Sequence, residues 1–138
     1  MTASRKAWFR ATREIVGLIQ QDVAAATGVT VTTVKRWERR GFPEPPDGVC
    51  DWLRAVREDH DRAVEAMAGE MSRGERAVLE IYRSQDDGGI DPVAGGEAAL
   101  PFGYRNSIAR SVAERLALAG VDVTWRYPDE DPGDKTES

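Results

Sequence analysis

The segment QQDVAAATGVTVTTVKRWERRG, residues 20–41, decides the fold of the first half of the chain. It places three alanines before a glycine, fills positions 29–34 with Val and Thr, and then carries five charged residues among positions 35–40. β-Branched residues favour strands. Their neighbours favour helices, because alanine is the best helix former, Gly28 suits a helix end and Thr30 suits an N-cap. The segment predicts two helices, 20–27 and 31–40, joined by a tight turn.

Helical patterns also lie on both sides of this segment. Apolar residues recur at three- and four-residue intervals over residues 5–18, where Gly17 marks the expected end of a helix. Residues 42–46, FPEPP, form a connector that no helix can cross. A longer helix should follow over residues 48–71, with Asp47 as its N-cap. Residues 1–70 are therefore expected to form one helical domain.

The second half of the chain differs from the first in composition and in hydrophobic pattern. Residues 76–84, RAVLEIYRS, are typical of a strand, and the glycine-rich residues 85–103 are typical of a loop. A helix capped by Asn106 or Ser107 should follow, and residues 121–127 alternate between apolar and polar as a half-buried strand does. We expect a small β-α-β unit over residues 71–127 and a disordered acidic tail over 128–138.

The predicted fold class is thus α+β and mainly α: a helix-turn-helix bundle of four to five helices followed by a small strand–helix–strand unit. Two strands alone do not form a stable sheet. The second unit is therefore expected either to pack on the long helix or to pair with a second copy of the chain.

Charge is unevenly distributed along the chain. Residues 1–41 carry a net charge of +5, whereas residues 42–138 carry −10. A basic N-terminal third on an acidic protein is the pattern expected where one end meets phosphates. No apolar run is long enough to span a membrane, and the first residues lack the apolar core of a secretion signal. We therefore expect a cytoplasmic protein without membrane contact.

Several chemical functions find no support in the sequence. Cys50 is the only cysteine and His60 the only histidine, so no multi-cysteine zinc site and no Ser/His/Asp arrangement can be assembled. Cys50 is expected to be a small buried apolar residue. The sequence predicts no enzyme activity, no metal and no cofactor.

Each position of residues 20–41 has a physical reason within a helix-turn-helix. Ala24 suits the close crossing of two helices, and Gly28 suits the positive φ of the turn. The other side of the third helix should face a DNA major groove. The residues expected to face inward, on the buried side of the motif, are Val23, Val29, Val34 and Trp37.

The run from Ile15 to Leu53 resembles the phage repressor and Cro type of helix-turn-helix domain, the Xre-like family. The pattern is carried by Gln20, Ala24, Gly28, Val34 and the pair Trp37–Glu38. The resemblance implies that Arg13 on the first helix pairs with Glu38, and that Gln20 contacts the DNA backbone. Ile19 departs from the pattern, since the family usually has Ser, Thr or Asn there as an N-cap.

The second half is similar, in order and spacing, to the C-terminal unit of small two-domain regulators that include anti-CRISPR-associated repressors. The similarity rests on GERAVLEIY, residues 74–82, and on GYRNSIARSVAERLALAG, residues 103–120. It implies that this unit mediates dimerisation.

The most specific interpretation is a DNA-binding transcriptional regulator, most simply a repressor that binds a palindromic operator as a homodimer. Lys35 and Arg36 would contact guanine, while Arg39 and Arg40 would contact phosphates. Alternatives are an antitoxin-type module with a protein partner at its C-terminal unit, or an accessory factor of excision or recombination. The residues expected to contact double-stranded DNA are Gln20, Gln21, Thr30, Val31, Thr32, Thr33, Lys35, Arg36, Arg39 and Arg40.

Overall fold

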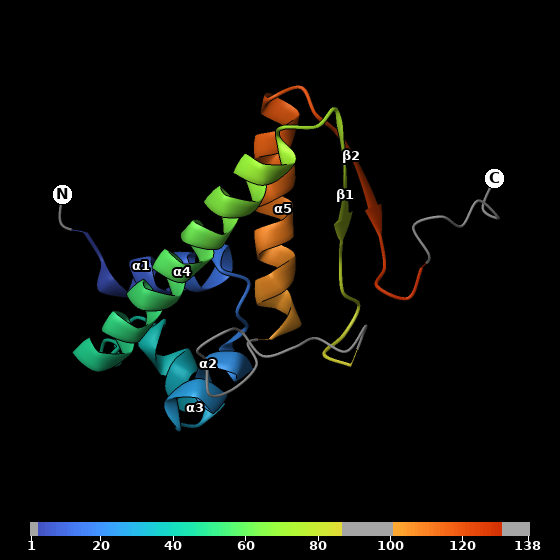
Figure 1. The fold of residues 1–138 in the computed structure, drawn as a ribbon. Helices are drawn as coiled ribbons and strands as arrows, with labels where there is room; N and C mark the ends of the chain where they lie inside the picture. Colours follow the sequence, from blue (N-terminus) through green and yellow to red (C-terminus); the bar gives the residue numbers. More distant parts are fainter. Residues whose placement is uncertain (1–2, 87–100, 131–138) are drawn as a thin grey trace. The chain divides into compact units, whose positions relative to one another are not determined.

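A computed structural model of the chain describes residues 3–86 and 101–130 (Figure 1). Within them it has five helices and one sheet of two strands, which confirms the predicted α+β, mainly helical fold class. The elements run in the order α1 (Arg5–Ile15), α2 (Gln20–Thr27), α3 (Val31–Trp37), α4 (Asp47–Met71), β1 (Arg76–Glu80), α5 (Phe102–Leu118) and β2 (Asp122–Arg126). None of the described helices is long and apolar enough to cross a membrane.

The chain divides into two compact units, residues 1–61 and residues 62–138. The boundary between them lies inside α4. Cys50, Leu53 and Val56, from the first part of α4, belong to the buried residues of the first unit. Val64 and Ala68, from its last part, belong to the core of the second. The helix α4 therefore contributes core residues to each unit.

The first unit has a core formed by all four of its helices. Phe9 of α1 packs edge-on against Trp37 of α3, with ring centroids 5.9 Å apart and ring planes at 83°. Val23 and Val34 are fully buried, as expected for the inner sides of α2 and α3. Val29 in the turn is only half-buried. The remaining buried apolar residues of the first unit include Val16, Leu18, Ala24, Cys50, Leu53 and Val56.

Two helix boundaries, on either side of the connector at residues 42–46, differ from the expected ones. The third helix ends at Trp37, because the backbone from Glu38 onward turns toward Gly41, whose φ is 90°. Asp47 does not precede α4 but lies in its first turn, where its carboxylate accepts a 2.8 Å hydrogen bond from Arg5. The carbonyl of Pro46 accepts the first backbone bond of that helix, from Cys50.

In the second unit, β1 and β2 are parallel and α5 connects them. The register pairs Arg76 with Asp122 and Glu80 with Arg126. Alternate residues point to opposite sides of the sheet. Packing of this unit on the end of the long helix is one of its sources of stability, as expected. The core on one side of the sheet includes residues of α4 and α5 and consists of Val64, Ala68, Ala77, Leu79, Val112, Leu116 and Val121.

The last helix begins earlier than expected. Neither Asn106 nor Ser107 caps it, since α5 starts at Phe102 with Pro101 as its N-cap. Asn106 instead is buried and holds the backbone of Tyr82, just beyond β1. Its side-chain oxygen accepts from the Tyr82 N–H and its nitrogen donates to the Tyr82 carbonyl, each at 2.8 Å. An amide can donate and accept at once, which an apolar residue could not do here.

Two other expected segments fall largely outside the described residues. Of the predicted loop 85–103, only residues 85–86 and 101–103 are described, and of the predicted disordered tail only residues 128–130. Those three residues form a turn. The Glu130 carboxylate accepts from the Tyr127 N–H at 2.7 Å, and Asp129 forms an ion pair with Arg83 at 2.8 Å.

We expect Asn106→Leu to reduce the free energy of unfolding by about 1–3 kcal/mol, because it leaves two backbone groups near the core unpaired. Chemical denaturation would measure the change, and hydrogen exchange should show faster exchange of the Tyr82 amide. Arg110→Ala, at an exposed position of the same helix, is the control and should change neither quantity. Unchanged exchange at Tyr82 in the Asn106 variant would contradict this role.

Candidate nucleic-acid interface

The turn between α2 and α3 is short and closely bonded. Gly28 adopts a φ of 73°, in the left-handed region that glycine tolerates best. Its N–H and that of Val29 both donate to the carbonyl of Ala24, at 2.9 and 3.2 Å. Ala24 is buried, as expected where two helices meet closely. These contacts fix the direction in which α3 leaves the turn.

The start of α3 is capped by threonine, as the sequence predicted. The Thr30 hydroxyl accepts from the Thr33 N–H at 3.2 Å, and the two hydroxyls lie 3.0 Å apart. Thr33 is half-buried, and its hydroxyl contacts the capping hydroxyl of Thr30. Thr30 and Thr33 therefore hold the first turn of α3 in place.

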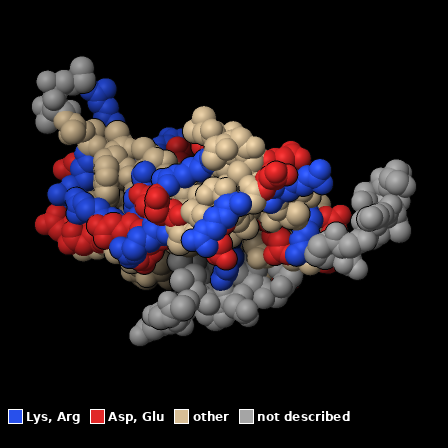
Figure 2. Space-filling model, turned by 45° about the horizontal axis from the view of Figure 1, so that its top comes forward, with Lys and Arg blue, Asp and Glu red and all other residues tan. Residues whose placement is uncertain are grey.

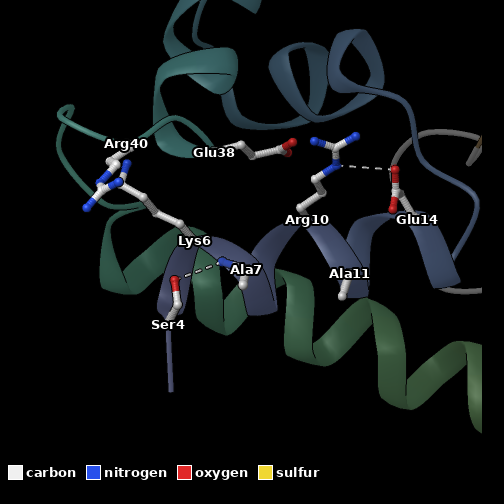
Figure 3. Close-up of a pocket in the computed structure, with 8 residues that line it drawn as sticks. All are labelled: Ser4, Lys6, Ala7, Arg10, Ala11, Glu14, Glu38 and Arg40. Carbon is white, nitrogen blue, oxygen red and sulfur yellow. Dashed lines mark hydrogen bonds and ion pairs between the residues drawn. The ribbon is translucent and has the colours of Figure 1, made fainter. Parts of the chain in front are cut away.

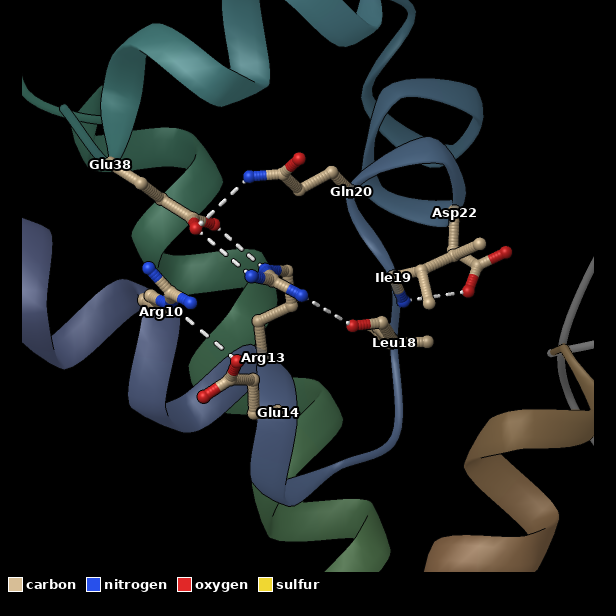
Figure 4. Close-up of polar contacts among 8 residues, drawn as sticks. All are labelled: Arg10, Arg13, Glu14, Leu18, Ile19, Gln20, Asp22 and Glu38. Carbon is tan, nitrogen blue, oxygen red and sulfur yellow. Dashed lines mark hydrogen bonds and ion pairs between the residues drawn. The ribbon is translucent and has the colours of Figure 1, made fainter.

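The start of α2 is stabilised in a different way. Ile19 occupies the N-cap and has no side chain that could accept a hydrogen bond. Asp22, three residues later, supplies the compensation: its carboxylate accepts from the Ile19 N–H at 2.9 Å (Figure 4). This is one half of a capping box, and its negative charge is also favourable at a helix N-terminus.

A buried ion pair ties α1 to the end of α3. Arg13 donates to both carboxylate oxygens of Glu38, at 2.7 and 2.9 Å (Figure 4). Only 8% of the Arg13 side chain and 3% of the Glu38 side chain are exposed. Arg13 also donates to the carbonyl of Leu18 at 3.0 Å, before α2 begins. One guanidinium thus connects α1, the segment leading to α2, and the residue that follows α3.

Gln20 joins the same network. Its side-chain nitrogen donates to Glu38 at 3.2 Å, and the residue is half-buried. The nitrogen therefore serves within the domain, which leaves the amide oxygen of Gln20 as its remaining polar side-chain atom. Its neighbour Gln21 is exposed.

The outward side of α3 carries the residues expected to contact DNA. Thr32, Lys35 and Arg36 are exposed, while Val31 is half-buried. The guanidinium of Arg36 lies over the ring of Phe42, 5.4 Å from its centroid. Four cations thus lie within residues 35–40, around the end of α3. The two that follow the helix, Arg39 and Arg40, are exposed as well.

These four cations differ from the arginines in the rest of the first unit because they have no carboxylate partner among the described residues. Lys35, Arg36, Arg39 and Arg40 form no ion pair with any carboxylate in residues 3–86 and 101–130. Lys6, whose amino group donates to backbone carbonyls, is the other basic residue without a carboxylate partner in the described part of this unit. Each of the remaining arginines of the unit has a carboxylate partner: Arg5 with Asp47, Arg10 with Glu14, Arg13 with Glu38, Arg54 with Asp51, and Arg57 with Asp61.

Both signs of charge are interspersed on one face of the molecule. On the face drawn in Figure 2, Lys and Arg side chains alternate with Asp and Glu and do not gather into one basic area. The four cations of residues 35–40 follow one another closely in the sequence. A cluster of this kind attracts an anion by ordinary Coulomb forces, which are strongest at low salt.

Lys6 is a structural residue that no pattern in the sequence singles out. Its amino group donates to three backbone carbonyls, those of Arg36, Trp37 and Pro43, at 3.0 to 3.1 Å. The last carbonyls of a helix lack partners within it, and a cation is favourable beside them. Lys6 therefore caps the end of α3 from α1. A lysine opening an amphipathic helix is too common a pattern to signal this contact.

A surface depression lies between α1 and the residues after α3 (Figure 3). Its walls carry both signs of charge: Lys6, Arg10 and Arg40 against Glu14 and Glu38. Arg10 is bonded to Glu14, and Lys6 is bonded to the carbonyls described above. Because most of these groups are already satisfied by the protein, the depression is a weaker candidate for an anion site than the outward side of α3. No group of three metal-ligating side chains occurs among the described residues.

No known protein-family model and no curated protein sequence matches this chain.

We expect Glu38→Ala to lower the free energy of unfolding by about 3–5 kcal/mol, because it leaves the Arg13 guanidinium buried without its partner. Glu14→Ala is the matched control: it removes a carboxylate from the exposed Arg10 pair, and should cost less than about 1 kcal/mol. Urea denaturation followed by tryptophan fluorescence would measure both. Equal destabilisation of the two variants would show that burial of the Arg13–Glu38 pair does not matter.

Proposed function

We propose that the protein is a sequence-specific DNA-binding transcriptional regulator, most simply a repressor, that acts as a homodimer. The observation that carries this proposal is the cluster of Lys35, Arg36, Arg39 and Arg40, which have no carboxylate partner among the described residues. In a helix-turn-helix protein the outward side of the second helix of the motif enters the major groove. Here that helix is α3, and its exposed cations would meet bases and phosphates.

The surroundings of α3 support this assignment. Specific recognition needs side chains held in a fixed position relative to the DNA, because a bidentate contact tolerates little misplacement. The Thr30 cap holds the start of α3, and Lys6 together with the Arg13–Glu38 pair holds its end. The cations would therefore be presented by a rigid helix.

The residues would divide between bases and backbone. Lys35 and Arg36 would contact guanine in the major groove, and the ring of Phe42 would steady the guanidinium of Arg36 on its way there. Arg39 and Arg40, beyond the end of the helix, would contact phosphates. The remaining contacts would be those of Thr32 and Val31 with thymine methyl groups and of Gln20 and Gln21 with the DNA backbone.

One such helix reads only a few base pairs, too few to select a site in a genome. Two copies related by a two-fold axis would double that length and would require a palindromic operator, with half-sites about 34 Å apart. Selection of binding sites from random DNA by the purified protein tests the proposal. A palindromic consensus is the expected result, whereas tandem sites would favour an accessory factor of recombination. Absence of any consensus would overturn sequence-specific recognition.

We expect Arg36→Ala to weaken binding to the selected operator by about 1–3 kcal/mol and to relax base preference at one position of each half-site. The fold should remain intact, since the Arg36 side chain is exposed and forms no ion pair in the described part of the chain. Arg10→Ala is the matched control, because it removes the same charge from an exposed position on α1. Gel-shift titration would measure both, and equal affinities of the two variants would contradict a role of Arg36 in base readout.

We expect Arg39→Ala to act differently, because a bond to phosphate carries no sequence information. Binding should weaken to a similar extent on operator and random DNA. The slope of log K against log salt should become shallower by about one for each phosphate that is no longer neutralised. Titrations at several salt concentrations would measure the slope. A change of base preference in this variant would place Arg39 at the bases instead.

A further inference from the structure

The sheet of the second unit is small, and in the described part of the chain its edges have no neighbouring strand. Within the described residues it consists of β1 and β2 alone, in parallel register. Two strands are marginal by themselves. An unpaired strand edge offers a row of N–H and C=O groups to another chain.

The outer edge of β1 is partly occupied. The backbone N–H and C=O of Tyr82, which continues β1, are both bonded to the side chain of Asn106. An amide in this position takes the place that a neighbouring strand would take. Asn106 therefore blocks strand pairing at this end of the β1 edge. The outer edge of β2 is a better site than the β1 edge for an additional strand.

The backbone of β2 is oriented to receive one. The Asp122 N–H donates to the Glu75 carbonyl at 2.9 Å, and the Arg126 carbonyl accepts from the Ile81 N–H at 3.0 Å. Both residues thus direct their backbone groups toward β1. Because successive residues of a strand alternate in this respect, the N–H and C=O of Val123 and Trp125 point to the outer edge. Trp125 itself is 43% exposed.

The sequence of β2, Asp-Val-Thr-Trp-Arg, is complementary to itself when two copies run antiparallel. With Thr124 opposite Thr124 of a second copy, Asp122 faces Arg126 and Val123 faces Trp125, twice each. Opposite charges and an aromatic–β-branched pair are favourable cross-strand neighbours. In the same register, Val123 and Trp125 are the residues whose outward backbone groups meet, so they can exchange hydrogen bonds across the pair. Side-chain and backbone requirements thus select one register.

We propose that β2 pairs edge to edge with β2 of a second copy, antiparallel, with the two-fold axis at Thr124. The result is a four-stranded sheet in the order β1-β2-β2-β1. This pairing deepens the proposed function, on which it rests in one respect: a dimeric regulator requires such an interface. In the pair, Arg126 lies between Glu80 of its own chain, with which it forms a 2.7 Å ion pair, and Asp122 of the second copy. Trp125 is covered by Val123 of that copy.

A residue on a two-fold axis lies opposite the same residue of the second copy. A charge introduced at that position therefore faces an identical charge, which permits a selective test. Thr124 is exposed, so charged residues can replace it without disturbing the core. Thr124→Lys and Thr124→Asp should each turn the dimer of the full chain into a monomer, because like charges then lie directly opposite. A mixture of the two variants should form a heterodimer. Sedimentation velocity measures all three samples, and circular dichroism checks that the variants keep their helices.

Val78→Lys is the matched control. Val78 is the register partner of Thr124 on β1 and is 49% exposed, but it lies one strand away from the proposed axis. This variant should remain a dimer. Dissociation by Val78→Lys with an intact dimer in Thr124→Lys would overturn the inference in favour of the β1 edge. A monomeric wild-type chain would overturn it outright.

Covalent trapping provides an independent readout. Facing residues that do not exchange hydrogen bonds in an antiparallel pair have Cα atoms about 4.5 Å apart, within the range that a disulfide bridges. Thr124→Cys should therefore form a disulfide-linked dimer on mild oxidation, and Val78→Cys should not. The native Cys50 does not interfere, since it is 1% exposed and burial raises the pKa of its thiol. Equal cross-linking of the two variants would contradict the register.

The two proposals can fail separately. If the Thr124 variants behave as expected but the wild-type dimer selects no DNA sequence, the interface stands and the DNA-binding function fails. If the wild-type chain selects a palindrome while Thr124→Lys leaves the dimer intact, the function stands and the β2 interface fails.

Discussion

The first unit depends on one constraint: the buried Arg13–Glu38 pair must stay together. The guanidinium is held by two bonds to Glu38 and one to the carbonyl of Leu18, and Gln20 adds a fourth bond to the network. Two charges this deeply buried are costly apart and tolerable only in contact. The pair therefore fixes where α3 ends relative to α1 and α2. The position of the cations on the outward side of α3 therefore depends on the Arg13–Glu38 pair.

The second unit is under a different constraint, because a sheet of two strands is only marginally stable by itself. One side of the sheet packs with Val64 and Ala68 of α4 and with the apolar stripe of α5. The edges remain, and they differ: a side-chain amide closes the end of β1, whereas β2 presents Trp125 and outward-facing backbone groups. That asymmetry distinguishes a protected edge from one available to a partner.

Local chemistry decides several features of the first unit, and these can be predicted from the sequence. The limits of α2 and the Thr30 cap were predicted correctly, because alanine propensity, a left-handed glycine and a capping hydroxyl all act within a few residues. Prediction failed where distant partners compete for a side chain. Asn106 resembles a helix cap in the sequence but binds Tyr82, 24 residues away. Asp47 likewise binds Arg5, and Lys6 has its three carbonyl partners in other segments.

By itself, the sequence determined the fold class, the turn at Gly28, the Thr30 cap, and the placement of Val34 on the buried side and Thr32 on the exposed side of a helix. Periodicity and glycine geometry are local properties, so they follow directly from the order of residues. Only the tertiary structure decided which cations remain without a carboxylate, since Arg5 and Arg13 find their partners, Asp47 and Glu38, far away in the chain. It also decided which strand edge is open, because Asn106 reaches Tyr82 only once α5 has packed beside β1.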